Sequence, residues 1–403
     1  MLDANGEGSD SYVIAAIDRA IQLKSTYNIR VMNLSLGRPV YESYADDPLC
    51  QAVEAAWRAG IVVVVSAGND GRDNSFGNDG YGTINAPGND PYVITVGAMR
   101  SMGTADPSDD AVASYSSKGP SAIDHVVKPD IVAPGNQIAS LLVQHGTLGL
   151  TNPQNVVLLS AYQSNASKVG SIPVQPTYNA DSNSAPPGVK IGSGYSSHYY
   201  ILNGTSMATA VVSGAVAILL QAQLALTPDQ VKMLLMQTAS KTFPTVTNVT
   251  DATTGQTFTS YYDIFTIGAG YLDLKSALKQ IKQAPSGPTA MSPTAIYDST
   301  SGDVELSFDP SSVFSDKAMW GASSANANKA MWGASGVWSD SVLAGNKAIW
   351  GASSVWGNKA MWGASSDTAE KAMWGAGAIW SNKALWGASS TTGSLSIMIA
   401  GEQ

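Results

Sequence analysis

A serine that could act as a nucleophile stands where a polar run meets an apolar one. The motif Gly-Thr-Ser-Met-Ala at residues 204–208 leads into residues 211–220, which are small and apolar on all sides. This composition predicts a buried helix, because a surface helix carries a polar face as well. Ser206 would lie near unpaired backbone N–H groups at the helix start. Two interpretations are open: Ser206 or Thr205 caps the helix, or Ser206 is a nucleophile with oxyanion donors.

The composition indicates a globular protein and excludes several classes of function. Of the 403 residues, 44% are hydrophobic and 13% charged, which allows a sizeable core in one large domain and a smaller part. The net charge of -9 argues against a nucleic-acid partner, since phosphates are bound by clustered Lys and Arg. No apolar run reaches the ~20 residues of a membrane span. The single cysteine, Cys50, excludes an intrachain disulfide and a zinc cluster, and its helical setting predicts a buried apolar role.

Strands and helices alternate along the first part of the chain. Helices are expected at residues 9–27, 48–60, 227–238 and 274–281, and strands at residues 30–37, 61–66 and 92–98. Asp47 with Pro48, and Thr227 with Gln230, are typical helix-start signals. This order predicts an α/β fold with a parallel sheet, whose ligands bind beyond the carboxyl ends of the strands. Those ends carry residues 35–37 and 66–69.

Tryptophan recurs at a fixed period beyond residue 315. Nine of the ten tryptophans lie there, each six or twelve residues after the previous one, in a unit close to Lys-Ala-Met-Trp-Gly-Ala-Ser-Ser. An even period places every tryptophan on one face of an extended chain. Two interpretations are open: stacked units form a β-solenoid, or the tail is a biased segment without a packed core. Surface adhesion or polysaccharide binding by the repeats is a hypothesis that the excised tail would test.

Five motifs stand in a fixed order along the chain. They are VMNLSLG at residues 31–37, SAGN at 66–69, SYSSKGP at 114–120, KPDIVAPG at 128–135 and GTSMA at 204–208. Together they resemble the subtilisin-like (S8) serine peptidases, and residues 46–60 are especially similar to the AprX-type alkaline proteases. The resemblance covers roughly residues 1–280. It implies a subtilisin-like parallel sheet with helices on both faces, incomplete at the N-terminus, followed by a Trp-rich repeat tail.

The resemblance implies a role for seven residues. Ser206 would be the acyl-forming nucleophile, and Asn69 would donate a side-chain N–H to the oxyanion beside the backbone N–H of Ser206. The remaining five would bind a polypeptide substrate: Ser35, Leu36 and Gly37 as an extended edge for its backbone, and Ala67 and Gly68 as a wall of the specificity pocket. The family implies a secreted or cell-envelope location and no required cofactor. Structural calcium is common in it, although no cluster of calcium ligands is evident in the sequence.

The chain departs from the family's pattern at the catalytic base. The family carries an aspartate motif and a histidine motif before its Ser-Leu-Gly strand, and the thirty or so residues before that strand here contain neither. In the triad the histidine takes the serine proton and the aspartate fixes its tautomer. His145 precedes Gly-Thr, as in the family's motif, but it follows Asn69 in the chain. We expect His125, His145 and His198 to be loop or surface residues and Asp130 to be structural.

The resemblance and the composition together divide the chain into four parts. We expect a partial peptidase domain at residues 1–282 with an insertion at about 141–198, and a Pro/Ser/Gly-rich linker with a short strand at 283–315. The repeat tail would span residues 316–390, and residues 391–403 would form the end.

We expect the chain as given to be an incomplete copy that is inactive alone. The alternatives are an inactive relative that binds peptides and a surface protein whose role lies in the tryptophan repeats. The reading frame upstream of Met1 should then continue into the histidine and aspartate motifs. Sequencing the upstream DNA checks this, and an in-frame stop codon close to Met1 would contradict it.

Overall fold

The computed structural model describes residues 8–74, 78–104, 106–143, 148–149, 152–162, 194–244, 246–251, 254–284, 289–298, 303–313, 399 and 401–402. The tryptophan repeats, His145 and most of the 141–198 insertion therefore lie outside the described residues. The described helices are α1 (Asp10–Tyr27), α2 (Pro48–Arg58), α4 (Thr205–Ala222), α5 (Pro228–Thr238) and α6 (Leu274–Gln280). The strands are β1 (Val31–Leu34), β2 (Val62–Ser66), β3 (Ile94–Arg100), β4 (Ala111–Val112), β5 (Ile131–Pro134), β6 (Ile138–Leu141), β7 (Val156–Leu158), β8 (Tyr195–Leu202), β9 (Val246–Thr250), β10 (Thr257–Tyr261), β11 (Thr294–Asp298) and β12 (Asp303–Ser307).

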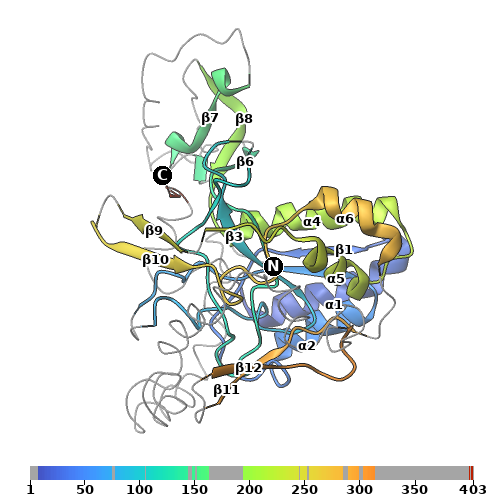
Figure 1. Cartoon of the computed structure of the whole chain (residues 1–403). Coiled ribbons are helices and arrows are strands. Elements are labelled where there is room, and N and C mark those ends of the chain that lie inside the picture. Colours follow the sequence, from blue (N-terminus) through green and yellow to red (C-terminus); the bar gives the residue numbers. More distant parts are fainter. Residues whose placement is uncertain are drawn as a thin grey trace.

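A five-stranded sheet forms the centre of the molecule. Its strands run β1-β2-β3-β4, with β5 also paired to β3; β4 alone is antiparallel. All five residues of β2 are buried, as its continuous run of valines predicts. Helix α4 packs on β1, β2, β3 and β5, whereas α2 packs on β2 and against α1, so helices flank the sheet (Figure 1). The predicted α/β fold is confirmed.

Three smaller sheets surround this centre. The antiparallel sheet β6-β8-β7 projects from the body at the top of Figure 1, and β9 with β10 forms a hairpin at the left. Strands β11 and β12 form a third antiparallel sheet inside the predicted 283–315 linker, and β12 covers the short strand expected there. The division of the chain into domains stays a prediction.

The helix-start signals in the sequence are confirmed. Asp47 is the N-cap of α2 and accepts hydrogen bonds from the backbone N–H groups of Leu49 and Cys50. Thr227 and Gln230 form both bonds of a capping box at the start of α5. Cys50 is fully buried in α2, and this burial raises the pKa of its thiol. Each start is fixed locally, because a side-chain oxygen satisfies first-turn N–H groups that the helix cannot.

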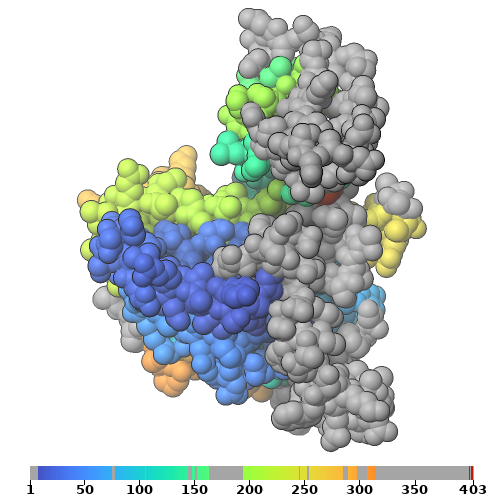
Figure 2. Space-filling model, turned by 180° about the vertical axis from the view of Figure 1, so that it is seen from behind, coloured from blue at the N-terminus to red at the C-terminus, as the bar shows by residue number. Residues whose placement is uncertain are grey.

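Helix α4 is not buried on all sides, so that prediction is wrong. Its residues Ala208, Val212 and Leu219 are buried against the sheet, but Ile218 is 43% exposed and the yellow-green atoms of α4 form part of the surface in Figure 2. The sheet covers one side of the helix, and α6 contacts only part of the rest. By length and composition alone α4 could also cross a membrane. Its packing against four strands is that of a core helix.

A buried cluster of charges joins three distant parts of the chain. The carboxylate of Asp130 lies 2.7 Å from the Lys128 ammonium and 3.2 Å from that of Lys232, and all three side chains are fully buried. Ser292 donates a hydrogen bond to Asp130, and Lys232 donates to the Pro91 carbonyl at 2.7 Å. The two lysines outweigh the desolvation of the Asp130 carboxylate, and its pKa is lowered. Asp130 is thus structural, and the cluster fastens the segment that carries Ser292.

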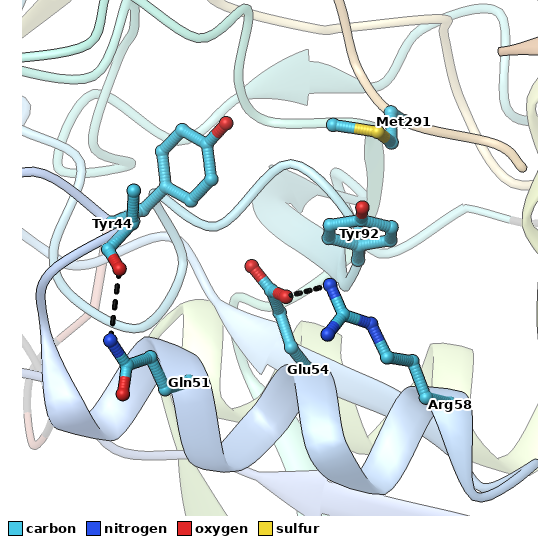
Figure 3. A pocket seen from close by; sticks show the side chains of 7 residues that line it. Tyr44, Gln51, Glu54, Arg58, Tyr92 and Met291 are labelled. Atoms are coloured by element: carbon cyan, nitrogen blue, oxygen red, sulfur yellow. Dashed lines mark hydrogen bonds and ion pairs between the residues drawn. The ribbon is translucent and has the colours of Figure 1, made fainter. Parts of the chain in front are cut away.

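A second buried carboxyl group, that of Asp90, keeps its proton to a higher pH than an exposed aspartate does. Burial, reinforced by the Glu54 carboxylate, raises the pKa of Asp90 to about 7. One oxygen of Asp90 accepts a hydrogen bond from the Tyr92 N–H at 2.9 Å. Glu54 forms an ion pair with Arg58 at 2.6 Å, beside a surface depression of about 500 Å³ (Figure 3). Since Asp90 keeps its proton when folded, it links stability to pH.

Replacing this carboxyl should flatten the pH dependence of stability. Between about pH 4 and 7 the unfolded chain has lost the Asp90 proton and the folded chain keeps it, so stability falls as the pH rises, by roughly 2–4 kcal/mol. In Asp90→Asn an amide oxygen can still accept from Tyr92, and the fall should be much smaller. Urea unfolding across this range measures it, with the exposed Asp18→Asn as control. Equal pH slopes in Asp90→Asn and the unaltered chain would contradict the assignment.

Candidate active site

The predicted nucleophile lies where the end of β1 meets the start of α4. Ser206 is the second residue of α4 and half-buried. Its hydroxyl donates to the Ser35 carbonyl at 3.4 Å, and the Ser35 hydroxyl donates to the Ser206 carbonyl at 2.7 Å. The tertiary fold therefore brings Ser35 and Ser206 together across 171 residues of sequence.

The side chain of Asn69 supplies the acceptor that α4 needs at its start. Its Oδ1 accepts from the Thr205 N–H at 2.9 Å and lies 3.1 Å from Thr205 Oγ1. The N-cap residue is Gly204, which has no side chain to do this. Ser206 and Thr205 do not cap the helix, because their hydroxyls bond to Ser35 and to Gly68. The capping interpretation of these two residues is therefore wrong.

The Nδ2 end of the same Asn69 amide borders a space beside Ser206. Its Oδ1 is held by Thr205 and would lie 3.5 Å from a Cβ added to Gly204. A Cβ added to Gly204 would lie 3.3 Å from Asn69 Nδ2 and 3.7 Å from Ser206 N. Gly204 also has φ +139°, which L side chains rarely adopt. Glycine thus keeps open a space that two N–H donors border, which is the arrangement an oxyanion requires.

Gly68 forms a tightly packed wall next to Asn69. Its φ is +114°, and an added Cβ would lie 2.6 Å from Ser117 Oγ and 2.7 Å from Asn85 Nδ2. The neighbouring Ala67 is fully buried. Asn85 also donates to Asp70 Oδ2 at 3.1 Å. Asn85 and Ser117 thus belong to the same wall, and no role was predicted for either.

The predicted substrate edge is only partly accessible. Ser35 is half-buried, whereas Leu36 and Gly37 are buried, and the Leu36 carbonyl accepts a hydrogen bond from Ser66 Oγ at 3.1 Å. The chain after this edge is held by two backbone hydrogen bonds between Arg38 and Ala86, at 3.0 and 2.8 Å. The edge is therefore fixed in position from both sides.

Arg38 anchors this edge to the two helices beside it. Its guanidinium pairs with Asp10 of α1 at 2.6 Å and with Asp47, the N-cap of α2, at 2.8 Å. Burial alone would lower the pKa of Arg38, but Asp47 and Asp10 outweigh it and the pKa is raised. Sequence reasoning missed Arg38, since its partners are 28 and 9 residues away. Its position directly after the Ser-Leu-Gly motif was the only available signal.

In the described residues, no hydrogen bond joins Ser206 to a histidine. His198 is exposed on β8, and His125 is half-buried, with its backbone carbonyl accepting from the Ala295 N–H at 2.9 Å. Burial lowers the pKa of the His125 imidazole. Searched over the described part of the chain, His, Cys, Asp and Glu side chains form no group of three that could hold a metal ion. The expectation about calcium stays untested.

Comparisons with known proteins point in one direction. The subtilase family model matches residues 1–259. Serine protease AprX of Bacillus subtilis (strain 168) is 35% identical over 246 residues, which are 60% of this chain and 45% of that protein. Subtilisin DY of Bacillus licheniformis is 29% identical over 240 residues, 60% of this chain and 59% of that protein. The chain thus spans about half the length of the curated relatives it matches.

Solved structures of similar chains include fervidolysin from Fervidobacterium pennivorans, a keratinolytic enzyme related to subtilisin. It is 24% identical, covers 72% of this chain with 30% of its own, and superposes with a TM-score of 0.40.

Two substitutions of Asn69 should separate the capping role of its Oδ1 from the donor role of its Nδ2. Asn69→Ala removes the acceptor for Thr205 N–H and should cost about 1 kcal/mol of unfolding free energy. Asn69→Asp keeps an acceptor and places a negative charge at the helix N-terminus, so its free energy of unfolding should be close to that of the unaltered chain. Urea unfolding measures both. If Asn69→Asp is as unstable as Asn69→Ala, the cap is not what stabilises α4.

Proposed function

Because this chain belongs to the subtilase family, we propose that it carries the acyl-transfer machinery of a serine endopeptidase, with Ser206 as nucleophile. One observation supports this assignment above all others. Asn69 Nδ2 and Ser206 N border the same space beside the serine, and Gly204 keeps it open. Two donors at that place can bind the oxyanion of a tetrahedral intermediate, whereas a helix start needs acceptors.

The reaction proposed for these residues has two stages. Ser206 Oγ attacks the scissile carbonyl of a polypeptide, and the carbonyl oxygen becomes an oxyanion that accepts hydrogen bonds from Ser206 N and Asn69 Nδ2. The amine leaves with a proton, and water then hydrolyses the acyl-serine. Ser206 must first give up its own hydroxyl proton to a base. In the described residues its hydroxyl proton is directed to the Ser35 carbonyl, which cannot serve as that base.

The substrate backbone would lie along residues 35–37, and the side chain before the scissile bond would contact the wall of Ala67 and Gly68. Gly68 supports this, because its missing Cβ leaves Asn85 and Ser117 in contact with the backbone at that wall. An exported location is part of the proposal and rests on family membership alone.

We further propose that the 403-residue chain is nearly inert by itself. Removing the catalytic histidine from subtilisin lowers turnover about 2 × 10⁶-fold, and the sequence holds no histidine motif of the family before Ser35. A peptide-binding role for the same groove is the competing proposal. Acylation of Ser206 distinguishes the two proposals, because only the peptidase proposal requires it.

Labelling with a fluorophosphonate probe tests the assignment of Ser206. The chain should label very slowly, and added imidazole should speed the reaction, since a free base can replace the missing one. Ser206→Ala should not label. Asn69→Ala should lower the rate by about 10²–10³, the size of effect found in subtilisin itself when an oxyanion donor is removed.

Two outcomes would contradict these proposals. Rapid labelling without imidazole would show that the chain has its own base. No labelling with imidazole, together with binding of a peptide to the folded chain, would favour the peptide-binding alternative.

A further inference from the structure

A glutamate near the end of the chain is buried among residues that are 266 to 330 positions away. The Glu402 side chain is 1% exposed, and its Oε1 lies 2.9 Å from Arg72 Nη2. The same oxygen accepts from the Ser114 N–H at 2.8 Å and from the Ser114 hydroxyl. Its Oε2 lies 3.8 Å from Arg100 Nη1. Burying a carboxylate costs so much that such a set of donors is needed to hold it.

The backbone groups of Glu402 and of Ile399 are bound as well. Asn136 Nδ2 donates to the Glu402 carbonyl at 2.8 Å, and the Glu402 N–H donates to Asn136 Oδ1 at 2.9 Å. The amide of Asn136 thus forms hydrogen bonds with both backbone groups of Glu402, as a neighbouring strand would. The carbonyl of Ile399 accepts from Asn155 Nδ2 at 2.5 Å and from Asn203 Nδ2 at 3.4 Å. These contacts fix the direction and register of the segment.

Glycine is required beside the glutamate. Gly401 has φ +65°, and an added Cβ would lie 2.3 Å from Asn203 Oδ1 and 2.9 Å from Asn136 Oδ1. A larger residue would therefore collide with two of the side chains that hold the segment. The sequence recognised is an acidic residue preceded by glycine.

Arg72 is held in place by contacts other than Glu402. Its Nε donates to Ser114 Oγ at 2.6 Å, its Nη1 pairs with Asp251 at 2.9 Å, and its guanidinium lies 4.8 Å from the centre of the Phe258 ring. A guanidinium fixed in this way is a preorganised site for a carboxylate.

The pocket adjoins the turn that carries the nucleophile. Asn203 directly precedes Gly204, and its Oδ1 accepts from the Gln137 N–H at 2.6 Å. Gly135, next to Asn136, accepts from the Gly204 N–H at 2.8 Å. Two of the residues that hold the segment, Asn136 and Asn203, are therefore adjacent to the turn at Gly204.

We propose that Ile399, Gly401 and Glu402 form a docking segment, and that the pocket of Arg72, Arg100, Ser114 and Asn136 is its receptor within the same chain. The pocket recognises the glutamate carboxylate through Arg72 and Ser114 and the backbone through Asn136. The proposal is independent of whether Ser206 is active.

Cleavage between the body and the docking segment tests this directly. A site for a sequence-specific protease is inserted after Ser365 in the full chain, and the cleaved protein is passed over a size-exclusion column. The C-terminal fragment should stay with the body. In Glu402→Gln it should dissociate at least about tenfold faster, because a charged hydrogen bond is lost. Gly401→Ala should act similarly, and Asp18→Asn should not.

A peptide that competes with the C-terminal fragment for the pocket gives a second test, which does not depend on the folding of any variant. A synthetic peptide of residues 395–403 should displace the fragment from the cleaved, unaltered protein, and the same peptide with glutamine at position 402 should not. Release of the fragment on cleavage alone, or equal retention with Glu402→Gln, would overturn the proposal. Dimers of the uncleaved chain that Glu402→Gln converts to monomers would place the docking between two copies and overturn it in the form stated.

Discussion

The hydrogen bond from Thr205 N–H to Asn69 Oδ1 is the contact on which the site depends. It satisfies the start of α4 with a side chain from the loop after β2, so sheet and helix are joined at the place where the chemistry is proposed. It also decides the orientation of an amide that could otherwise turn either way. A helix capped by its own residue would leave Asn69 unconstrained and its Nδ2 without a defined target.

The same principle recurs wherever distant segments meet in this protein. Arg38 joins the edge after β1 to the start of α2, and Asp130 joins α5 to the segment containing Ser292. Each link is a charge inside the fold, which is stable only when partners are held close. Such links fix the relative positions of the elements more than they add to the free energy of unfolding. They fix elements whose apolar contacts alone would allow small shifts.

Glu402 extends this pattern to the far end of the chain. Its contacts reach the loop after β2, strand β3, the loop after β4 and the loop between β5 and β6, so that one short segment touches four parts of the molecule. Asn203, which donates to the Ile399 carbonyl at 3.4 Å, is the residue directly before Gly204.

The sequence by itself determined the local elements and the identity of the candidate site. Apolar periodicity and caps placed α1, α2, β2 and α5 almost to the residue, because neighbours along the chain satisfy those rules. Ordered motifs selected Ser206 and Asn69. Only the tertiary structure decided what covers α4, which group caps it, and where Arg38 and Glu402 find their partners. Those outcomes depend on contacts across tens to hundreds of residues, and no local pattern encodes them.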